Sequence, residues 1–428
     1  MKTFILKKLK TQEVEKLLKR PSINLESTFK VVKPILNEVR RHGLKAALKY
    51  SKKYDGAIPE NILVSKKEFE DAEKKLDAQV KSAIKTAERN IWIFHKQQIP
   101  KSYRIETMQG VICAREFRAI QNVGLYIPGG NAVLPSTMLM LGIPAKLAGC
   151  KRIVVCSPAK DGKINNALLY AAKIIGVDEF YKIGGAQAIA LMAYGDKKIK
   201  NVDKIFGPGN QFVTAAKLLV SIDMNGCSID MPAGPSEVLV IADEDANPAF
   251  IAADLLSQAE HGADSQVVLI SNSLSLIDRV KKEVNKQIKF LPRKNFAAAS
   301  IESSFALLVG DFNEAINFSN DFAPEHLILH LKNPEFYKSK INNAGSVFLG
   351  EYSPESVGDY ASGTNHSLPT YGYAKSFGGV SVECFMKAIT FQKLSKKGLE
   401  GIADTVETLA KVESLDAHKN AVTIRMKK

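Results

Sequence analysis

Apolar positions recur at helical spacing through most of the first hundred residues of the chain, and the pattern then changes. Residues 28–54 and 66–98 place apolar side chains three and four positions apart, which predicts two long helices. Two short alternating runs follow, at 103–108 and 111–117, and Gln109-Gly110 between them predicts a hairpin turn.

From residue 120 onward, short apolar runs typical of strands alternate with amphipathic segments. Strands that are separated by helices of about 10–15 residues indicate parallel sheets with crossover helices. The pattern breaks and starts again near residue 236, which suggests two α/β halves, although no repeat is visible in the sequence. The predicted strands are 123–127, 152–156, 179–183, 238–242, 266–271, 305–309 and 327–331, and the predicted helices are 137–147, 165–175, 186–193, 248–260 and 274–287.

The last hundred residues are less regular. Residues 345–385 are rich in Gly, Ser and Tyr and give no clear element, and so long an irregular segment is expected to border a functional site. The tail from Gly398 returns to helical spacing, with Ile402, Val406, Leu409 and Val412 on one face.

Composition limits the class of protein. A chain of 428 residues is long enough for more than one domain. No apolar run reaches the length of a membrane span, and the lysine-containing N-terminus lacks the apolar stretch of a signal peptide. The five scattered cysteines form no C-x-x-C pair, which fits reduced thiols. We therefore expect a cytoplasmic protein.

The net charge of +14 raises the question of a nucleic-acid partner. Many of the lysines alternate with glutamates on predicted helix faces, which is typical of a solvated surface. No zinc finger, aromatic RNA-binding pattern or basic tail is present, so no nucleic-acid binding is expected. The charge could help to attract an anionic dinucleotide, but a solvated surface explains it more simply.

Candidate chemistry gathers near a few histidines. Gln258 and His261 lie three residues apart at the end of a predicted helix and could hold one ion, although alone they indicate only a polar helix end. Glu325 and His326 follow Pro324, and in a loop before a strand both could reach one substrate as general acid and base.

Further candidates lie in the glycine-rich segment, in the tail and in two loops. Asp359 and His366 stand beside glycines that would allow a ligand to approach the backbone, and Glu413 and His418 end the last predicted helix. The loops 126–130 and 207–210 could each bring backbone N–H groups to a phosphate. Neither completes G-x-G-x-x-G, so the loops alone do not predict NAD.

Together these segments resemble the histidinol dehydrogenase family. The most specific run extends from Ile229 through Pro-Ala-Gly-Pro-Ser236 to Asp243 and on to Gln258-Ala-Glu-His261. Other segments that are similar to the family, in the same order, surround Tyr126, Gln187, Asn210, Glu325, His326, Asp359, His366, Glu413 and His418. The resemblance covers residues from about 30 to 418.

The resemblance implies an activity and roles for these residues. The family oxidises L-histidinol to L-histidine through the aldehyde with two NAD⁺, in the last step of histidine biosynthesis. It binds one zinc ion per subunit at positions that match Gln258, His261, Asp359 and His418, the last of these from the partner subunit of a homodimer. Positions matching His326 and Glu325 are catalytic: His326 takes the alcohol proton, and Glu325 activates water. The implied substrate-binding residues are Ser236, Gln258, His261, His326, Asp359, His366, Glu413 and His418, and the implied NAD contacts are Tyr126, Gln187 and Asn210.

The resemblance also implies an α/β fold of two Rossmann-like parallel-sheet domains that lack the GxGxxG fingerprint, with small helical terminal segments. The expected divisions are a helical segment 1–25, a larger domain from 26–120 and 236–380 with most of the zinc and catalytic site, an NAD-side domain 121–235, and a helical segment 381–428 that serves the partner's site.

Three other readings remain open on the residues alone. A zinc hydrolase of amino-acid derivatives would also place Glu beside His near a metal, and would turn over without NAD. A basic nucleic-acid-binding protein would show salt-dependent affinity and be indifferent to chelators. A related dehydrogenase could act on another amino alcohol.

Overall fold

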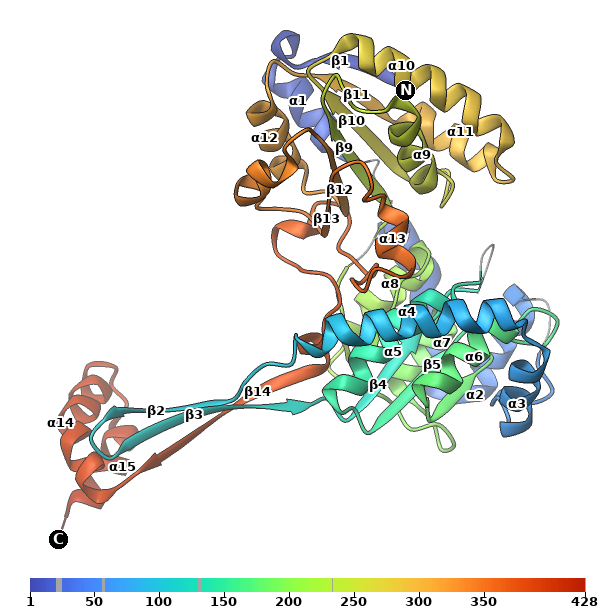
Figure 1. Ribbon diagram of the computed structural model, residues 1–428. Coiled ribbons are helices and arrows are strands. Elements are labelled where there is room, and N and C mark those ends of the chain that lie inside the picture. Colours follow the sequence, from blue (N-terminus) through green and yellow to red (C-terminus); the bar gives the residue numbers. More distant parts are fainter. Residues whose placement is uncertain (21–24, 56–57, 130–132, 233, 428) are drawn as a thin grey trace.

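A computed structural model describes residues 1–20, 25–55, 58–129, 133–232 and 234–427. Gly130, at the end of one predicted phosphate loop, and Ala233, within the most specific run, lie outside these residues. Figure 1 shows three parts: two units each built on a parallel sheet, and a long arm that carries the C-terminus. None of the helices in the described part of the chain combines the length and apolar character that a membrane span requires.

The first unit is built on a six-stranded sheet in which all neighbours are parallel. Its central strands read as nearly continuous apolar runs, as expected where both faces are covered. Helices α9, α10 and α11 pack on one face, and α1 and α12 on the other. The strand order is β1 (Lys2–Ile5), β11 (Phe305–Leu308), β10 (Gln266–Ser271), β9 (Glu237–Ala242), β12 (His326–His330), β13 (Ser346–Leu349), and the helices are α1 (Thr11–Leu18), α9 (Pro248–Ala259), α10 (Leu274–Gln287), α11 (Lys294–Ser303) and α12 (Phe312–Phe322).

The second unit has a five-stranded parallel sheet covered in the same way. Helices α3, α4, α5 and α6 enclose one core, and α2, α7 and α8 enclose the other. The strand order is β6 (Glu179–Tyr181), β5 (Arg152–Cys156), β4 (Asn122–Tyr126), β7 (Lys204–Phe206), β8 (Ser228–Ile229), and the helices are α2 (Leu25–Asp55), α3 (Lys66–Lys75), α4 (Ala78–Lys96), α5 (Pro135–Ala148), α6 (Asn166–Ile175), α7 (Gly185–Tyr194) and α8 (Gln211–Ser221).

The arm is a three-stranded antiparallel sheet of β2 (Tyr103–Met108), β3 (Val111–Ala119) and β14 (Met386–Leu394), followed by α14 (Lys396–Val412) and α15 (Asp416–Met426). Gly110 makes the predicted hairpin turn at φ 80°. Apolar side chains along the arm are exposed, among them Ile105, Phe391 and Val412. The arm therefore offers an uncovered apolar surface.

The remaining elements are short: α13 (Glu355–Tyr360) and the 3₁₀ turns Leu6–Lys8, Ile288–Phe290, Pro334–Lys340, Tyr373–Lys375 and Val382–Phe385. The segment 345–385, which showed no regular pattern, thus contains β13 and α13. The terminal segments hold strands as well as the predicted helices, because β1 pairs with β11 and β14 pairs with β3. The predicted helix after Gly398 is two helices, broken where Ser414 has φ 58°.

The prediction of two parallel-sheet halves is confirmed. The helices before residue 100 nevertheless pack differently from the predicted grouping of 26–120 with 236–380. α2 contacts α7 and α8, and α4 contacts α5, so these helices lie on the five-stranded sheet. Their apolar faces complete the two cores of that sheet, and helical periodicity alone does not say which sheet a helix covers. The domain boundaries themselves stay a prediction.

Candidate functional site

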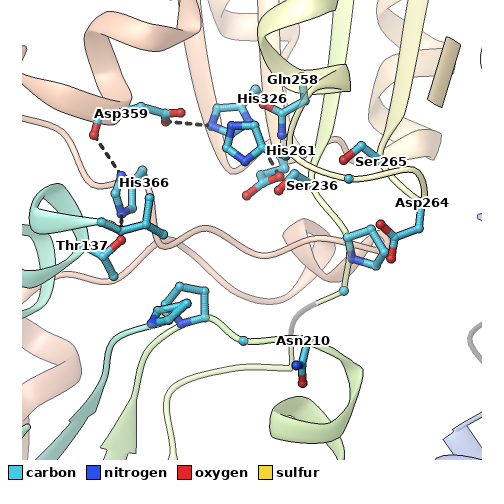
Figure 2. A pocket seen from close by; sticks show the side chains of 18 of the residues that line it. Thr137, Asn210, Ser236, Gln258, His261, Asp264, Ser265, His326, Asp359 and His366 are labelled. Atoms are coloured by element: carbon cyan, nitrogen blue, oxygen red, sulfur yellow. Dashed lines mark hydrogen bonds and ion pairs between the residues drawn. The ribbon is translucent and has the colours of Figure 1, made fainter. Parts of the chain in front are cut away.

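A pocket of about 390 Å³ lies between the two parallel sheets (Figure 2). The five-stranded sheet contributes the segments that leave the carboxyl ends of β4 and β7, where open α/β sheets commonly bind ligands. The other unit contributes the segments that enter β9, β10 and β12, together with the end of α9 and part of α13. The predicted site residues that line the pocket are Asn210, Ser236, Gln258, His261, Glu325, His326, Asp359 and His366.

Glu325 and His326 sit where the chain enters β12, and both are buried. The backbone N–H of Glu237 donates to Glu325 Oε2 at 2.8 Å, and His326 Nδ1 lies 3.1 Å from the carbonyl oxygen of Glu237. Since a carbonyl only accepts, Nδ1 carries a hydrogen. His326 Nε2 then points to Asp359 Oδ1 at 3.4 Å. The two predicted catalytic residues are therefore neighbours held by one residue of the adjacent strand.

Gln258, His261 and Asp359 meet the pocket from two helices. Gln258 is buried near the end of α9, whereas His261 follows that helix and is exposed to the pocket. Asp359 comes from α13, and its Oδ1 atom is buried with no well-formed hydrogen bond, as is His326 Nε2. A buried carboxylate oxygen without a donor is costly unless a proton or cation satisfies it.

Glu355, which the sequence analysis did not single out, lies beside this cluster. Its side chain is buried and accepts from Ser257 Oγ at 2.7 Å. In the amide orientation that satisfies its neighbours, Gln258 donates to Glu355 at 2.7 Å. Glu355 and Asp359 are four residues apart on α13, a helical spacing that the glycine-rich surroundings obscured.

Burial and crowding shift the pKa values of this cluster. Removal from water raises the pKa of Glu325 to about 8 and that of Glu355 to about 8. Burial alone would lower the pKa of His326, but Glu325, Asp359 and Glu355 together raise that pKa to about 10. Although the His261 ring is exposed to the pocket, the pocket walls remove part of its water, and this desolvation lowers its pKa against the opposing effect of Asp359. The lowered pKa favours the neutral imidazole that binds metals.

His366 joins the two units. Its Nδ1 lies 2.9 Å from the carbonyl oxygen of Asp359, and its Nε2 lies 3.0 Å from Thr137 Oγ1 on α5 (Figure 2). Nδ1 must donate to the carbonyl, so a neutral ring accepts from the threonine hydroxyl. Burial lowers the pKa of His366, consistent with that neutral ring. Thr137 is a second residue that the sequence analysis missed, because contact between α5 and the loop at 366 depends on tertiary structure.

The three residues matched to NAD contacts are placed differently from one another. Asn210 lines the pocket, where its side-chain oxygen caps α8 by accepting from the N–H groups of Phe212 and Val213. Tyr126 and Gln187 are buried away from the pocket lining. The Tyr126 hydroxyl accepts from the Gly185 N–H at 3.0 Å, at the start of α7. Among the three, only Asn210 faces the pocket.

Glu413 and His418 lie at the far end of the arm. Glu413 follows α14 and His418 lies in α15, and both are exposed. Figure 1 places these helices at the tip of the arm, away from the pocket between the sheets. Within one chain these two residues do not join the other predicted site residues.

Comparison with known proteins shows which family shares this arrangement. The family model described as histidinol dehydrogenase matches residues 18–426. The chain belongs to the histidinol dehydrogenase family. The histidinol dehydrogenase of Vibrio parahaemolyticus is 50% identical over 429 residues, covering 100% of this chain and 99% of that protein. The chloroplastic histidinol dehydrogenase of Arabidopsis thaliana is 51% identical, with coverage of 100% and 92%.

A solved structure extends the likeness to three dimensions. The crystal structure of histidinol dehydrogenase from Elizabethkingia anophelis superimposes with a TM-score of 0.95 at 49% identity, and the match covers 100% of this chain and 98% of that one. The two-sheet architecture with its arm is therefore a histidinol dehydrogenase fold.

The donor set in the pocket fits a divalent cation only in part. Across the described ranges, no three His, Cys, Asp or Glu side chains stand close enough to form a metal site. The pocket does bring together the Gln258 amide, the His261 imidazole and the Asp359 carboxylate. Nitrogen and oxygen donors of this kind suit zinc, and the unsatisfied Asp359 Oδ1 suits a cation. These three donors are one fewer than the four of a tetrahedral zinc site.

The raised pKa of Glu355 predicts a pH effect on stability. The folded protein holds the proton of Glu355 more tightly than the unfolded chain does. The stability that the protonated side chain contributes is therefore fully present below pH 4.5, the ordinary pKa, and is lost as the pH rises toward 8. Replacing Glu355→Gln should flatten the fall in unfolding free energy across this window by about 1 kcal/mol or more. Urea unfolding of chelator-treated protein at a series of pH values measures it. The exposed Glu335→Gln serves as control and should follow the wild type; parallel curves for all three proteins would contradict the burial of an acidic Glu355.

Proposed function

We propose that this chain oxidises L-histidinol to L-histidine through the aldehyde, with two NAD⁺ and one zinc ion per subunit. Membership of the histidinol dehydrogenase family supports the reaction. The observation that carries the proposal is the buried Glu325–His326 pair on the wall of a pocket whose opposite wall is the carboxyl edge of a parallel sheet. The free cysteines fit a reducing compartment, which supports action in the cytoplasm.

Gln258, His261 and Asp359 would hold the zinc ion, with His418 of a second subunit as the fourth ligand. When bound, zinc would supply a positive centre that orients the amine and imidazole of the substrate. The chain prepares this site in two ways. Glu355 accepts from the Gln258 amide nitrogen and so fixes the amide plane, and the lowered pKa of His261 keeps its ring neutral.

His326 is the proposed base for the alcohol proton. Its Nδ1–H is engaged by the Glu237 carbonyl, so Nε2 is the atom that must take the proton. In the chain without a cation, Asp359 stands 3.4 Å from Nε2 and helps to keep the ring protonated. A cation held by Asp359 would offset that carboxylate, lower the pKa of His326 and free Nε2 for the proton.

Glu325 is the proposed base for the second oxidation. The aldehyde must gain a water oxygen before it can lose a second hydride, and a carboxylate beside the pocket can take the proton of that water. Burial raises the pKa of Glu325 to about 8, so the carboxylate form, which acts as the base, becomes more abundant as the pH rises toward 8. NAD⁺ accepts one hydride in each oxidation, and the carboxyl edge of the five-stranded sheet, with Asn210, is its proposed place.

A homodimer would complete the site. Glu413 and His418 lie exposed at the end of an arm whose apolar side chains are uncovered, among them Phe391 and Val412. A two-fold arrangement that lays each arm on the other subunit would cover these side chains and bring both residues to the pocket. Glu413 would then pair with the substrate ammonium, and Ser236 and His366 would complete the substrate contacts.

The proposed reaction sets the number of NADH molecules formed per histidinol. The wild-type protein should release two NADH per L-histidinol, should lose this activity on chelation and should regain it with zinc. Glu325→Gln should stop at the aldehyde and slow the second oxidation by about 10²–10⁴-fold, because water loses its base. Absorbance at 340 nm counts the NADH. The exposed Glu335→Gln is the control; turnover without NAD, or two NADH at the normal rate from Glu325→Gln, would contradict the scheme.

The proposed homodimer predicts that two inactive variants can complement each other. His326→Ala and His418→Ala should each be inactive alone, but dissociation and reassociation of the mixture should restore about a quarter of wild-type activity. Half of the dimers are then mixed, and each mixed dimer has one site free of both substitutions. NADH formation before and after mixing measures the recovery. A mixture no more active than its two parents would show that His418 does not act across subunits.

A further inference from the structure

Arg20, just after α1, forms a buried two-pronged ion pair with Glu237 at the start of β9. Arg20 Nε and Nη2 donate to Glu237 Oε1 and Oε2, each at 2.9 Å, and the two side chains are 6% and 1% exposed. The backbone N–H of Tyr371 donates to Glu237 Oε1 as well, at 2.9 Å. The Glu237 carboxylate is thus held by three donors, and its orientation is fixed.

Arg20 also holds the turn that leads into the Glu325–His326 pair. Its guanidinium carbon lies 3.4 Å from the centroid of the Phe322 ring, and Nη2 is 3.4 Å from the carbonyl oxygen of Ala323. Ala323 has φ 51°, a left-handed conformation that is costly for alanine and needs support from its surroundings. This residue ends α12, and the chain passes directly through Pro324 into Glu325.

The backbone of Glu237 contacts both members of the pair. Its N–H donates to Glu325 Oε2 at 2.8 Å, and its carbonyl accepts from His326 Nδ1 at 3.1 Å. One peptide residue therefore sets the carboxylate direction of Glu325 and the ring orientation of His326. Arg20 forms its ion pair with the side chain of that same residue, Glu237.

We infer that Arg20 is a positioning residue for the Glu325–His326 pair, acting through Glu237 and the Ala323 turn. The inference rests on the proposed function, since it takes its meaning from the roles given to Glu325 and His326. Arg20 is not among the residues that line the pocket, so we expect it to act on the pair from outside the pocket. Its effect passes through protein atoms alone, and a displacement of the pair by a fraction of an ångström is enough to slow the chemistry.

The opposing view is that Arg20 only stabilises the fold, because breaking a buried ion pair is destabilising in any protein. Another two-pronged arginine–glutamate pair, whose side chains are 16% and 26% exposed, provides a control. Arg152 Nε and Nη2 donate to Glu179 Oε1 and Oε2 at 2.5 and 2.9 Å, at the edge of the five-stranded sheet and away from the pocket lining. Arg152→Met therefore reports the loss of such a pair without a change at the site.

The experiment compares kcat and KM of the full-length, zinc-loaded protein. Arg20→Met should lower kcat by between about tenfold and a hundredfold, and should leave KM for histidinol and NAD within about twofold. Arg20→Lys, which keeps the charge and one hydrogen bond, should recover part of kcat. Arg152→Met should lower the melting temperature and leave kcat unchanged. The inference is wrong if the kcat of Arg20→Met stays within about twofold of that of Arg152→Met.

A double substitution tests the route through Glu237. In a Glu237→Gln background the ion pair is already gone, so adding Arg20→Met should lower kcat by a clearly smaller factor than it does in the wild type, and the remaining loss reports the contact of Arg20 with the Ala323 turn. If the two losses in kcat instead multiply, Arg20 acts by a path that does not include Glu237, and the stated route is wrong.

Crystal structures of the wild type and Arg20→Met test the positioning role of Arg20 independently of the proposed function. If the wild type makes no NADH from histidinol, the proposed function fails, yet the structures still test the positioning. In Arg20→Met the two contacts between the Glu237 backbone and the pair should lengthen beyond hydrogen-bond distance. Unchanged contacts would overturn the inference whatever reaction the enzyme catalyses.

Discussion

The arrangement of the pocket depends on three acidic side chains gathered around one imidazole. Glu325, Glu355 and Asp359 surround His326 in a region largely removed from water. One imidazolium cannot offset three carboxylates, so the cluster must keep protons, as the raised pKa values of Glu325 and Glu355 indicate, or take up a cation. Asp359 Oδ1 has only the long 3.4 Å contact with His326 Nε2 and no well-formed hydrogen bond, so this oxygen is where a cation would bind. Both the proposed metal and the proposed base chemistry follow from this imbalance.

The two sheets face the pocket with opposite ends of their strands. The five-stranded sheet presents its carboxyl edge, which suits an anionic dinucleotide, whereas the six-stranded sheet presents the amino ends of β9 and β12, where Glu237 joins Glu325 to His326. His366 and Thr137 tie the halves together across the opening. The arm exposes apolar side chains that the proposed homodimer would cover, and the same dimer would bring a fourth donor to the pocket.

Much of the fold could be predicted from local patterns. The buried parallel strands β9 and β10 read as unbroken apolar runs, and the hairpin at Gly110 carries a turn signal. Strand β1 was missed because its neighbour β11 lies some three hundred residues away in the chain, and such pairing leaves no local mark. The placement of α2 and α4 on the five-stranded sheet was missed for the same reason, since the apolar face of a helix does not show which sheet it packs against.

For the site, too, sequence motifs were predictive and contacts between distant segments were not. Resemblance brought together Gln258, His261, Glu325, His326 and Asp359, which the structure places around one pocket. The residues it missed, such as Glu355 and Arg20, act on that group through contacts between distant elements, and an ion pair that spans 217 positions has no sequence signature. Tyr126 and Gln187 line no part of the pocket, so any role in NAD binding would pass through the loops that they support.

X-ray diffraction at the zinc absorption edge, on crystals of the zinc-loaded protein, would show directly whether a cation and a second chain complete the pocket. We expect one anomalous peak per subunit, at about 2.0–2.2 Å from nitrogen or oxygen atoms of Gln258, His261 and Asp359, with His418 of the partner subunit beside it. A peak elsewhere, no peak, or a complete ligand set from one chain would contradict the proposal that the acidic pocket is finished by a cation and a partner arm.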